Sequence, residues 1–134
     1  MIKYFGWIDI REYAEDCDPV NEKKLLTTIE KYISKNKLNE ISYLARIHSA
    51  NGGWHLLLSG GANHFNDRIK ALFGLLEMIA NLAKGSYGQM YFWNDENDEN
   101  PNAYNEFDVY VLIRGKITKK KDTIFSPLSP TVED

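Results

Sequence analysis

The sequence predicts an α+β fold: a ferredoxin-like βαββαβ core with an additional C-terminal β-strand, with two helices on one face of an antiparallel sheet. Segments with a two-residue hydrophobic period alternate with helical segments in this order along the chain. Asn51-Gly52 separates two of the strand segments and is the strongest short signal for a hairpin. At 134 residues, without an internal repeat or linker, residues 1–134 are expected to form a single domain.

The first strand is expected at residues 2–10. Tyr4 and Ile8 fall on one face and Phe5 and Trp7 on the other, because side chains alternate along a strand. Apolar side chains on both faces indicate a central strand, covered on at least part of each side.

Two helices follow from capping and periodicity. Asp18 and Pro19 suit the N-cap and first position of a helix over residues 19–35. A second helix begins after Asn63 or Asn66 and ends before Gly85. Gly74 inside it costs about 1 kcal/mol relative to alanine, so close packing of this helix on the sheet is expected there. The apolar stripes of the two helices are Leu25, Leu26, Ile29, Tyr32 and Ile33, and Ile69, Leu72, Phe73, Leu76, Ile79 and Leu82.

The remaining strand segments alternate apolar and polar residues. Residues 116–122 are basic and suit an exposed strand end that resists edge pairing. The prolines in residues 125–134 exclude regular structure throughout this tail. The expected strands are residues 41–47, starting with an inward-facing Ile41, then 54–59, 87–93 and 107–113.

Composition excludes several classes of protein. The net charge of −3 opposes general electrostatic binding to nucleic acid or to an anionic membrane, and we expect neither partner. Cys17 is the single cysteine, so an internal disulfide or a multi-cysteine metal site cannot form. Charged residues follow the first ten residues too soon for a signal peptide, and no apolar run reaches membrane-spanning length. We therefore expect a cytoplasmic protein without cofactor.

An acidic loop follows the fourth expected strand. Its length and its flanking aromatic residues Tyr91, Trp93, Tyr104 and Tyr110 distinguish it from an ordinary hairpin loop. Two interpretations stay open, a solvated loop and a binding surface for a positively charged partner. In the second, the partner-binding residues are Trp93, Asp95, Glu96, Asp98, Glu99, Tyr104, Glu106 and Asp108.

Other chemistry finds weaker support. The loop lacks the glycine and the final glutamate of an EF-hand, and no histidine pair has metalloprotease spacing. Residues 84–91 resemble an RNA-binding strand motif, but Ser86 shifts its spacing and acids follow it directly. A small ferredoxin-like enzyme using His64 with Asp67 or Glu77 as acid and base remains the alternative function.

The chain resembles the immunity protein 7 family of bacterial polymorphic toxin systems. The resemblance is carried by SYGQMYFWNDEN (86–97), NEFDVYVLIRGKI (105–117) and FSPLSPTVED (125–134), with weaker agreement in FGWIDI (5–10) and in residues 60–64. It implies a small non-enzymatic antidote that binds the catalytic domain of a toxin encoded beside it. It does not imply which toxin activity is blocked.

Many toxins of such systems are nucleases, so the resemblance suggests a toxin with a basic active-site cleft, and the charge pattern fits this suggestion. A nuclease attracts a polyanion and so has a basic cleft, which carboxylates on a projecting loop can occupy. Trp93 and Tyr104 would supply packed anchors. We expect a monomer or a weak homodimer, the latter through the fifth strand or the aromatic sheet face.

Overall fold

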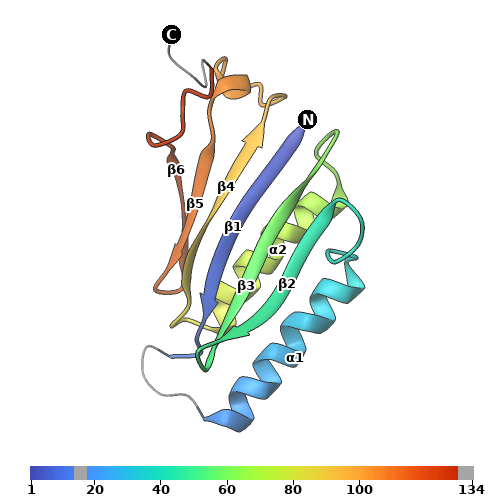
Figure 1. The fold of residues 1–134 in the computed structure, drawn as a ribbon, viewed down its shortest axis with the longest axis vertical. Coiled ribbons are helices and arrows are strands. Elements are labelled where there is room, and N and C mark those ends of the chain that lie inside the picture. Colours follow the sequence, from blue (N-terminus) through green and yellow to red (C-terminus); the bar gives the residue numbers. More distant parts are fainter. Residues whose placement is uncertain (14–17, 130–134) are drawn as a thin grey trace.

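A six-stranded antiparallel sheet and two helices make up the computed structural model, which describes residues 1–13 and 18–129 (Figure 1). Cys17 and residues 130–134 lie outside the described residues. The elements are β1 (Ile2–Ile10), α1 (Pro19–Lys35), β2 (Tyr43–Ala50), β3 (Gly53–Ala62), α2 (Asp67–Leu82), β4 (Tyr87–Asn94), η1 (Ala103–Asn105), β5 (Asp108–Ile113) and β6 (Lys116–Lys121).

The strand order β2-β3-β1-β4-β5-β6 confirms the predicted fold class. β1 lies between β3 and β4, and the helices connect β1 to β2 and β3 to β4, which is the ferredoxin-like arrangement. β5 extends the sheet by hairpin pairing with β4, as predicted for the additional strand. The basic segment forms a sixth strand on β5, where only an exposed strand end was expected. As the edge strand, its lysines oppose further pairing.

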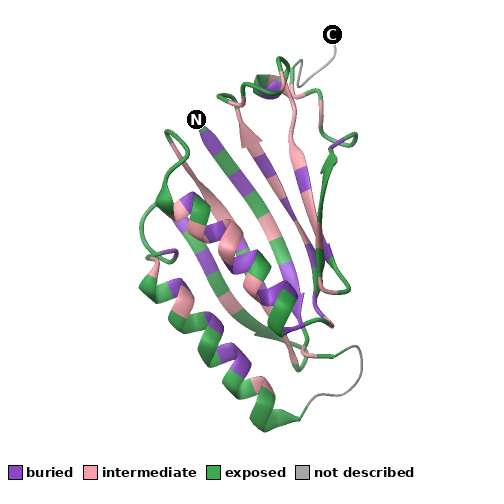
Figure 2. Cartoon of the chain, turned by 180° about the vertical axis from the view of Figure 1, so that it is seen from behind, coloured by how far each residue is buried: buried purple, intermediate pink, exposed green. Residues whose placement is uncertain are grey.

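Both helices lie on the face of the sheet seen in Figure 2. The Asp18 side chain accepts a hydrogen bond of 2.9 Å from the backbone N of Val20, so α1 begins where its capping residues predict. Asn66 caps α2 by accepting from the backbone N of Ile69 at 2.9 Å. These capping hydrogen bonds explain why α1 begins directly after Asp18 and α2 directly after Asn66.

The hydrophobic core lies between the helices and one face of the sheet. Tyr4 and Ile8 on β1 are buried beneath the helices together with Ile29 of α1 and Leu72 of α2. Phe5 and Trp7 point to the opposite face and stay exposed, because none of the described elements covers them. The central position of β1 was therefore predicted correctly, and the helices cover one of its two sides.

Ile41 does not begin β2 as predicted. Ser42 adopts φ +71°, a left-handed conformation that breaks the strand alternation, and β2 starts at Tyr43. Ile41 is 93% exposed as a result. Leu38 enters the core in its place, and its carbonyl accepts from the backbone N of Ala45 at 2.9 Å.

Gly74 accommodates the other helix and not the sheet. The hydroxyl of Tyr32 on α1 occupies the space that a Cβ at Gly74 would need. This hydroxyl donates to the carbonyl of Ala71 on α2 at 2.8 Å. The absent side chain thus allows a polar helix–helix contact, which the periodicity of α2 alone does not reveal.

Candidate functional site

Residues 95–107 form a long connection between β4 and β5. Asn94, the last residue of β4, pairs with Ile2 at the start of β1, so the loop leaves the sheet beside the amino end of the chain. Within the loop only Ala103–Asn105 forms a helical turn, and Ala103 is its buried residue. The acidic residues therefore lie at one end of the sheet, beyond its last hydrogen-bonded pairs.

Asparagines at every third position order this loop. The side-chain oxygens of Asn94, Asn97 and Asn100 each accept a hydrogen bond from the backbone N two residues later, at 3.0, 3.1 and 3.0 Å. Their carbonyls accept from the backbone N three residues later, at 3.3, 3.3 and 3.1 Å. The result is three consecutive asparagine turns, with an Asp-Glu pair in each of the first two. The sequence NDENDENPN indicates clustered charge and excludes an EF-hand, but its spacing of asparagines was not interpreted as a series of turns.

Asp95 and Glu96 each have a partner far away in the sequence. The N-terminal ammonium of Met1 donates to Asp95 Oδ1 at 2.5 Å, and this hydrogen bond to Asp95 raises the pKa of the amino group. His64 Nδ1 lies 2.8 Å from Glu96 Oε1. Asp95 and Glu96 therefore hold the base of the loop against the Met1 amino group and the His64 side chain.

Asp98 and Glu99 project further. Both are exposed, and within the described residues their carboxylates have no ion pair or hydrogen bond. By contrast, Glu106 accepts from Asn100 Nδ2 at 3.0 Å, and Asp108 lies 3.6 Å from Lys119 Nζ. Of the six predicted acids, Asp98 and Glu99 are the pair left available to a partner.

The predicted aromatic anchors play two different roles. Trp93 Nε1 donates to the carbonyl of Tyr104 at 2.9 Å, and Lys3 Nζ lies 5.5 Å from the centre of the Trp93 ring. Trp93 thus ties the loop to the sheet. The ring of Tyr104 remains 62% exposed and is free to contact a partner.

The segment after β6 fastens the far side of the loop, which the sequence interpretation missed. Phe107 N donates to Ser126 Oγ at 2.9 Å, and Leu128 N donates to the carbonyl of Asn105 at 2.9 Å. Asp122 organises this segment by accepting hydrogen bonds from residues 124–126. Burial alone would raise the pKa of Asp122, but these hydrogen bonds outweigh it and lower the pKa.

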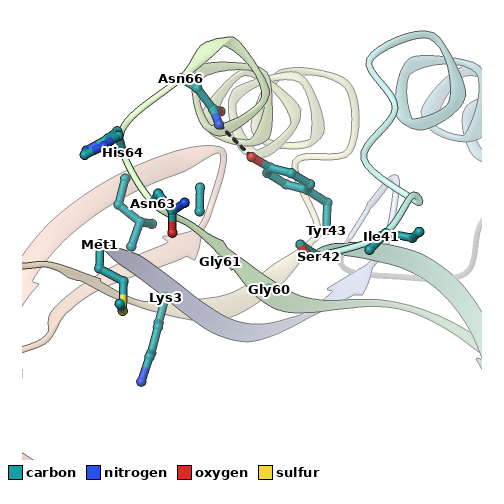
Figure 3. Close-up of a pocket in the computed structure, with 12 residues that line it drawn as sticks. Met1, Lys3, Ile41, Ser42, Tyr43, Gly60, Gly61, Asn63, His64 and Asn66 are labelled. Atoms are coloured by element: carbon teal, nitrogen blue, oxygen red, sulfur yellow. Dashed lines mark hydrogen bonds between the residues drawn. The ribbon is translucent and has the colours of Figure 1, made fainter.

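Within the described residues, no hydrogen bond or ion pair joins His64 to Asp67 or Glu77. His64 pairs with Glu96, whereas Asp67 opens α2 and Glu77 lines a separate hollow beside Tyr110 and Ile117. His64 does line an open hollow together with residues 1–3, 41–43, 60–63 and Asn66 (Figure 3). In this hollow Asn66 Nδ2 donates to the Tyr43 hydroxyl at 2.7 Å, and no carboxylate belongs to its lining.

Residues 1–13 and 18–129 contain no group of three or more His, Cys, Asp or Glu side chains that could hold a metal ion. Their helices are too short or too polar to cross a membrane.

The fold is a ferredoxin-like sheet extended by β5 and β6, with an ordered acidic loop at one end. The family model described as Immunity protein 7 matches residues 1–134, and the chain belongs to this family. The family implies an immunity protein of a toxin system, which binds a cognate toxin protein. Searches of curated proteins and of solved structures found no significant match.

Proposed function

We propose that this chain neutralises its cognate toxin by inserting the acidic loop, residues 95–107, into a basic cleft of the toxin's catalytic domain. The observation that carries the proposal is the pair Asp98 and Glu99, exposed and without an ionic partner in the described residues. An immunity protein needs a surface of this kind wherever its toxin is positively charged.

The order of the loop supports this role. The side chain and carbonyl of Asn97 hold the turn that carries Asp98 and Glu99. A loop that is already ordered loses less conformational freedom on binding than a mobile one. The asparagine turns thus keep two like charges adjacent, and a basic cleft relieves their mutual repulsion.

A nuclease is the toxin class that fits best. A nuclease cleft binds phosphates through lysine and arginine, and carboxylates can take the place of those phosphates. Opposite fields also accelerate encounter, which matters when newly made toxin must be captured in the cytoplasm. Tyr104, beside the acids and largely exposed, would supply the packed contact that slows dissociation.

Rescue of toxin-producing cells tests the proposal. The toxin domain encoded beside this chain is expressed from an inducible promoter, with the wild-type chain or a variant in trans. Wild type should restore growth and co-purify with the toxin domain. The double variant Asp98→Lys/Glu99→Lys should restore growth only in part and should co-purify with less of the toxin domain. Asp67→Asn combined with Glu77→Gln serves as the control for the enzymatic alternative and should rescue like wild type. Rescue by the loop variant at wild-type potency would move the binding surface elsewhere.

A further inference from the structure

The face of the sheet opposite the helices, called here the open face, carries an unusual amount of exposed apolar surface. No helix of the described residues covers this side of the sheet (Figure 1). The segment after β6 reaches it at one corner, where the Phe125 ring meets Tyr91 edge to face. Soluble proteins rarely leave a contiguous apolar patch of this kind unless it is an interaction surface. The large side chains exposed there are Phe5, Trp7, Leu44, Leu57, Tyr87 and Ile113.

The strand register makes this patch continuous. Trp7 on β1 lies opposite Leu57 on β3, and residues opposite one another in a sheet share a face. The rings of Trp7 and Tyr87 meet edge to face with centroids 6.1 Å apart. Phe5 lies opposite the partly buried Tyr91 on β4 and so continues the same surface.

Positive charge borders the patch. Lys3 on β1 and Arg46 on β2 project from this face, and the β5–β6 register places Lys116 and Lys120 there as well. Asp9 is the one carboxylate among the described residues of these strands on this face, and it is buried against Arg11 and Tyr87. The open face is thus cationic in a chain whose net charge is −3.

We propose that the open face is a second contact surface for the cognate toxin. It binds an apolar patch on the toxin that is bordered by carboxylates. The inference rests on the proposed function in that it assigns the partner to the same toxin. Charge complementarity defines the chemistry of the partner surface, since Lys3, Arg46 and Lys120 would each meet an acid. The toxin then presents a basic cleft to the acidic loop and an acid-bordered apolar surface beside it.

The two surfaces adjoin. Trp93 fastens the acidic loop through Tyr104 and also lies under the ammonium of Lys3 on the open face. Lys3 and Phe5 are two residues apart on β1 and therefore lie on the same side of the sheet. One partner can therefore cover the loop end and the open face together, with the Lys3–Trp93 contact at the junction.

A second copy of the chain suits the open face less well. Two open faces packed about a two-fold axis would bring their lysines and arginines together, with no exposed carboxylate on the described part of either face to offset them. Single-stranded nucleic acid would suit the rings and cations but would meet the acidic loop at one end. Self-association through this face, or binding of single-stranded nucleic acid to it in place of the toxin, would contradict the proposal.

Paired serine substitutions test the proposal. Leu44→Ser/Leu57→Ser on the open face is compared with Val20→Ser/Leu82→Ser, which removes similarly exposed side chains from α1 and α2. Binding of the catalytically inactive toxin domain is measured by surface kinetics. The open-face variant should bind about 10- to 100-fold more weakly, mainly through faster dissociation, while the helix variant should match wild type. Equal affinities for the two variants would overturn the inference, and matched unfolding midpoints guard against a loss of fold.

A charge pair and two control ligands complete the test. Arg46→Glu should weaken toxin binding, whereas Lys31→Glu on α1, with the same change in charge, should not. If Glu99→Lys slows association while both open-face variants bind normally, the loop proposal stands and this inference fails. A dimer of the free chain that Leu44→Ser/Leu57→Ser dissociates, with toxin affinity unchanged, would assign the face to self-association and overturn it. Micromolar binding of a 20-nucleotide oligo(dT), lost in Arg46→Glu, with unchanged toxin affinity would equally overturn it.

Discussion

Ser126 donates two hydrogen bonds to the same carboxylate oxygen of Asp122, one from its backbone N and one from its Oγ, both at 2.8 Å. The same Oγ accepts from the backbone N of Phe107 at 2.9 Å, at the point where the acidic loop enters β5. A buried carboxylate in the segment after β6 therefore positions the end of the loop. The serine hydroxyl is the relay between them.

Asp122→Asn should destabilise the chain by about 2–3 kcal/mol, because the amide cannot accept the same set of hydrogen bonds as the carboxylate. Urea unfolding at pH 7 measures this loss. The control is Asp98→Asn, an exposed position where a change within about 0.5 kcal/mol is expected. A loss at Asp122 no larger than at Asp98 would show that the segment is held by other contacts.

The same residue should make stability depend on acid pH. The pKa of Asp122 in the folded chain is lowered from its ordinary value of 3.8, so the unfolded chain binds the proton more tightly. Its contribution is fully present above the unfolded pKa and is lost as the pH falls through the folded pKa. The stability difference between wild type and Asp122→Asn should therefore shrink below about pH 4. A difference that stays constant from pH 6 to pH 2 would contradict the assignment.

Gly74→Ala and Tyr32→Phe should couple. In the wild type, a methyl group at Gly74 meets the Tyr32 hydroxyl, so the gain in helix propensity is lost to the clash. In the Tyr32→Phe background the nearest ring carbon is 3.6 Å away, and Gly74→Ala should stabilise by about 0.5–1 kcal/mol. Denaturant unfolding of the four variants gives the coupling energy. Additive effects would mean that the Tyr32 side chain moves away from the added methyl group without a loss of stability.

Asn97→Ala should loosen the acidic loop, whereas Asn97→Asp should preserve it, since aspartate retains the oxygen that accepts from Glu99 N. Amide hydrogen exchange reports this directly. The Glu99 amide should exchange faster in Asn97→Ala and near the wild-type rate in Asn97→Asp. Global stability should change little, because the turn is exposed. Identical protection in all three proteins would place the order of the loop elsewhere.

Ser86→Ala should cost about 1–3 kcal/mol, because it removes a buried hydroxyl that bonds both the backbone N and the carbonyl of Arg11. Ser86 is 1% exposed; its Oγ accepts from Arg11 N at 2.9 Å and donates to the Arg11 carbonyl at 3.2 Å. The contact joins the end of β1 to the residue preceding β4. Ser49→Ala, at an exposed position on β2, is the control and should be neutral. Comparable unfolding midpoints for the two variants would refute this role.

The fold was largely predictable because its signals are local. Asp18, Pro19 and the Asn51-Gly52 turn fix element boundaries through short-range backbone preferences. Ile41 was placed wrongly because Ser42 takes a left-handed conformation that no residue preference announces. β6 was not predicted, because its lysines do not alternate with apolar residues. Its pairing with β5, which the sequence pattern does not indicate, makes it a strand.

The candidate site was predictable in composition but not in geometry. Clustered charge identified the loop, yet the pairings of Asp95 with Met1 and of Glu96 with His64 join residues far apart in the sequence. The same holds for Asp122, whose role depends on the position of Phe107. The exposure of one side of β1 could not be predicted either, because the alternation of residues shows two apolar faces but not what covers each of them.

The association rate of the toxin domain with Glu99→Lys, compared with Glu30→Lys at low and at physiological salt, tests the central claim most directly. Both variants change the net charge by the same amount, and Glu30 lies on the exposed side of α1. The acidic-loop account predicts association at least about 5-fold slower for Glu99→Lys at low salt, a difference that narrows as salt screens the charges, and little change for Glu30→Lys. Equal association rates for the two variants at low salt would contradict it.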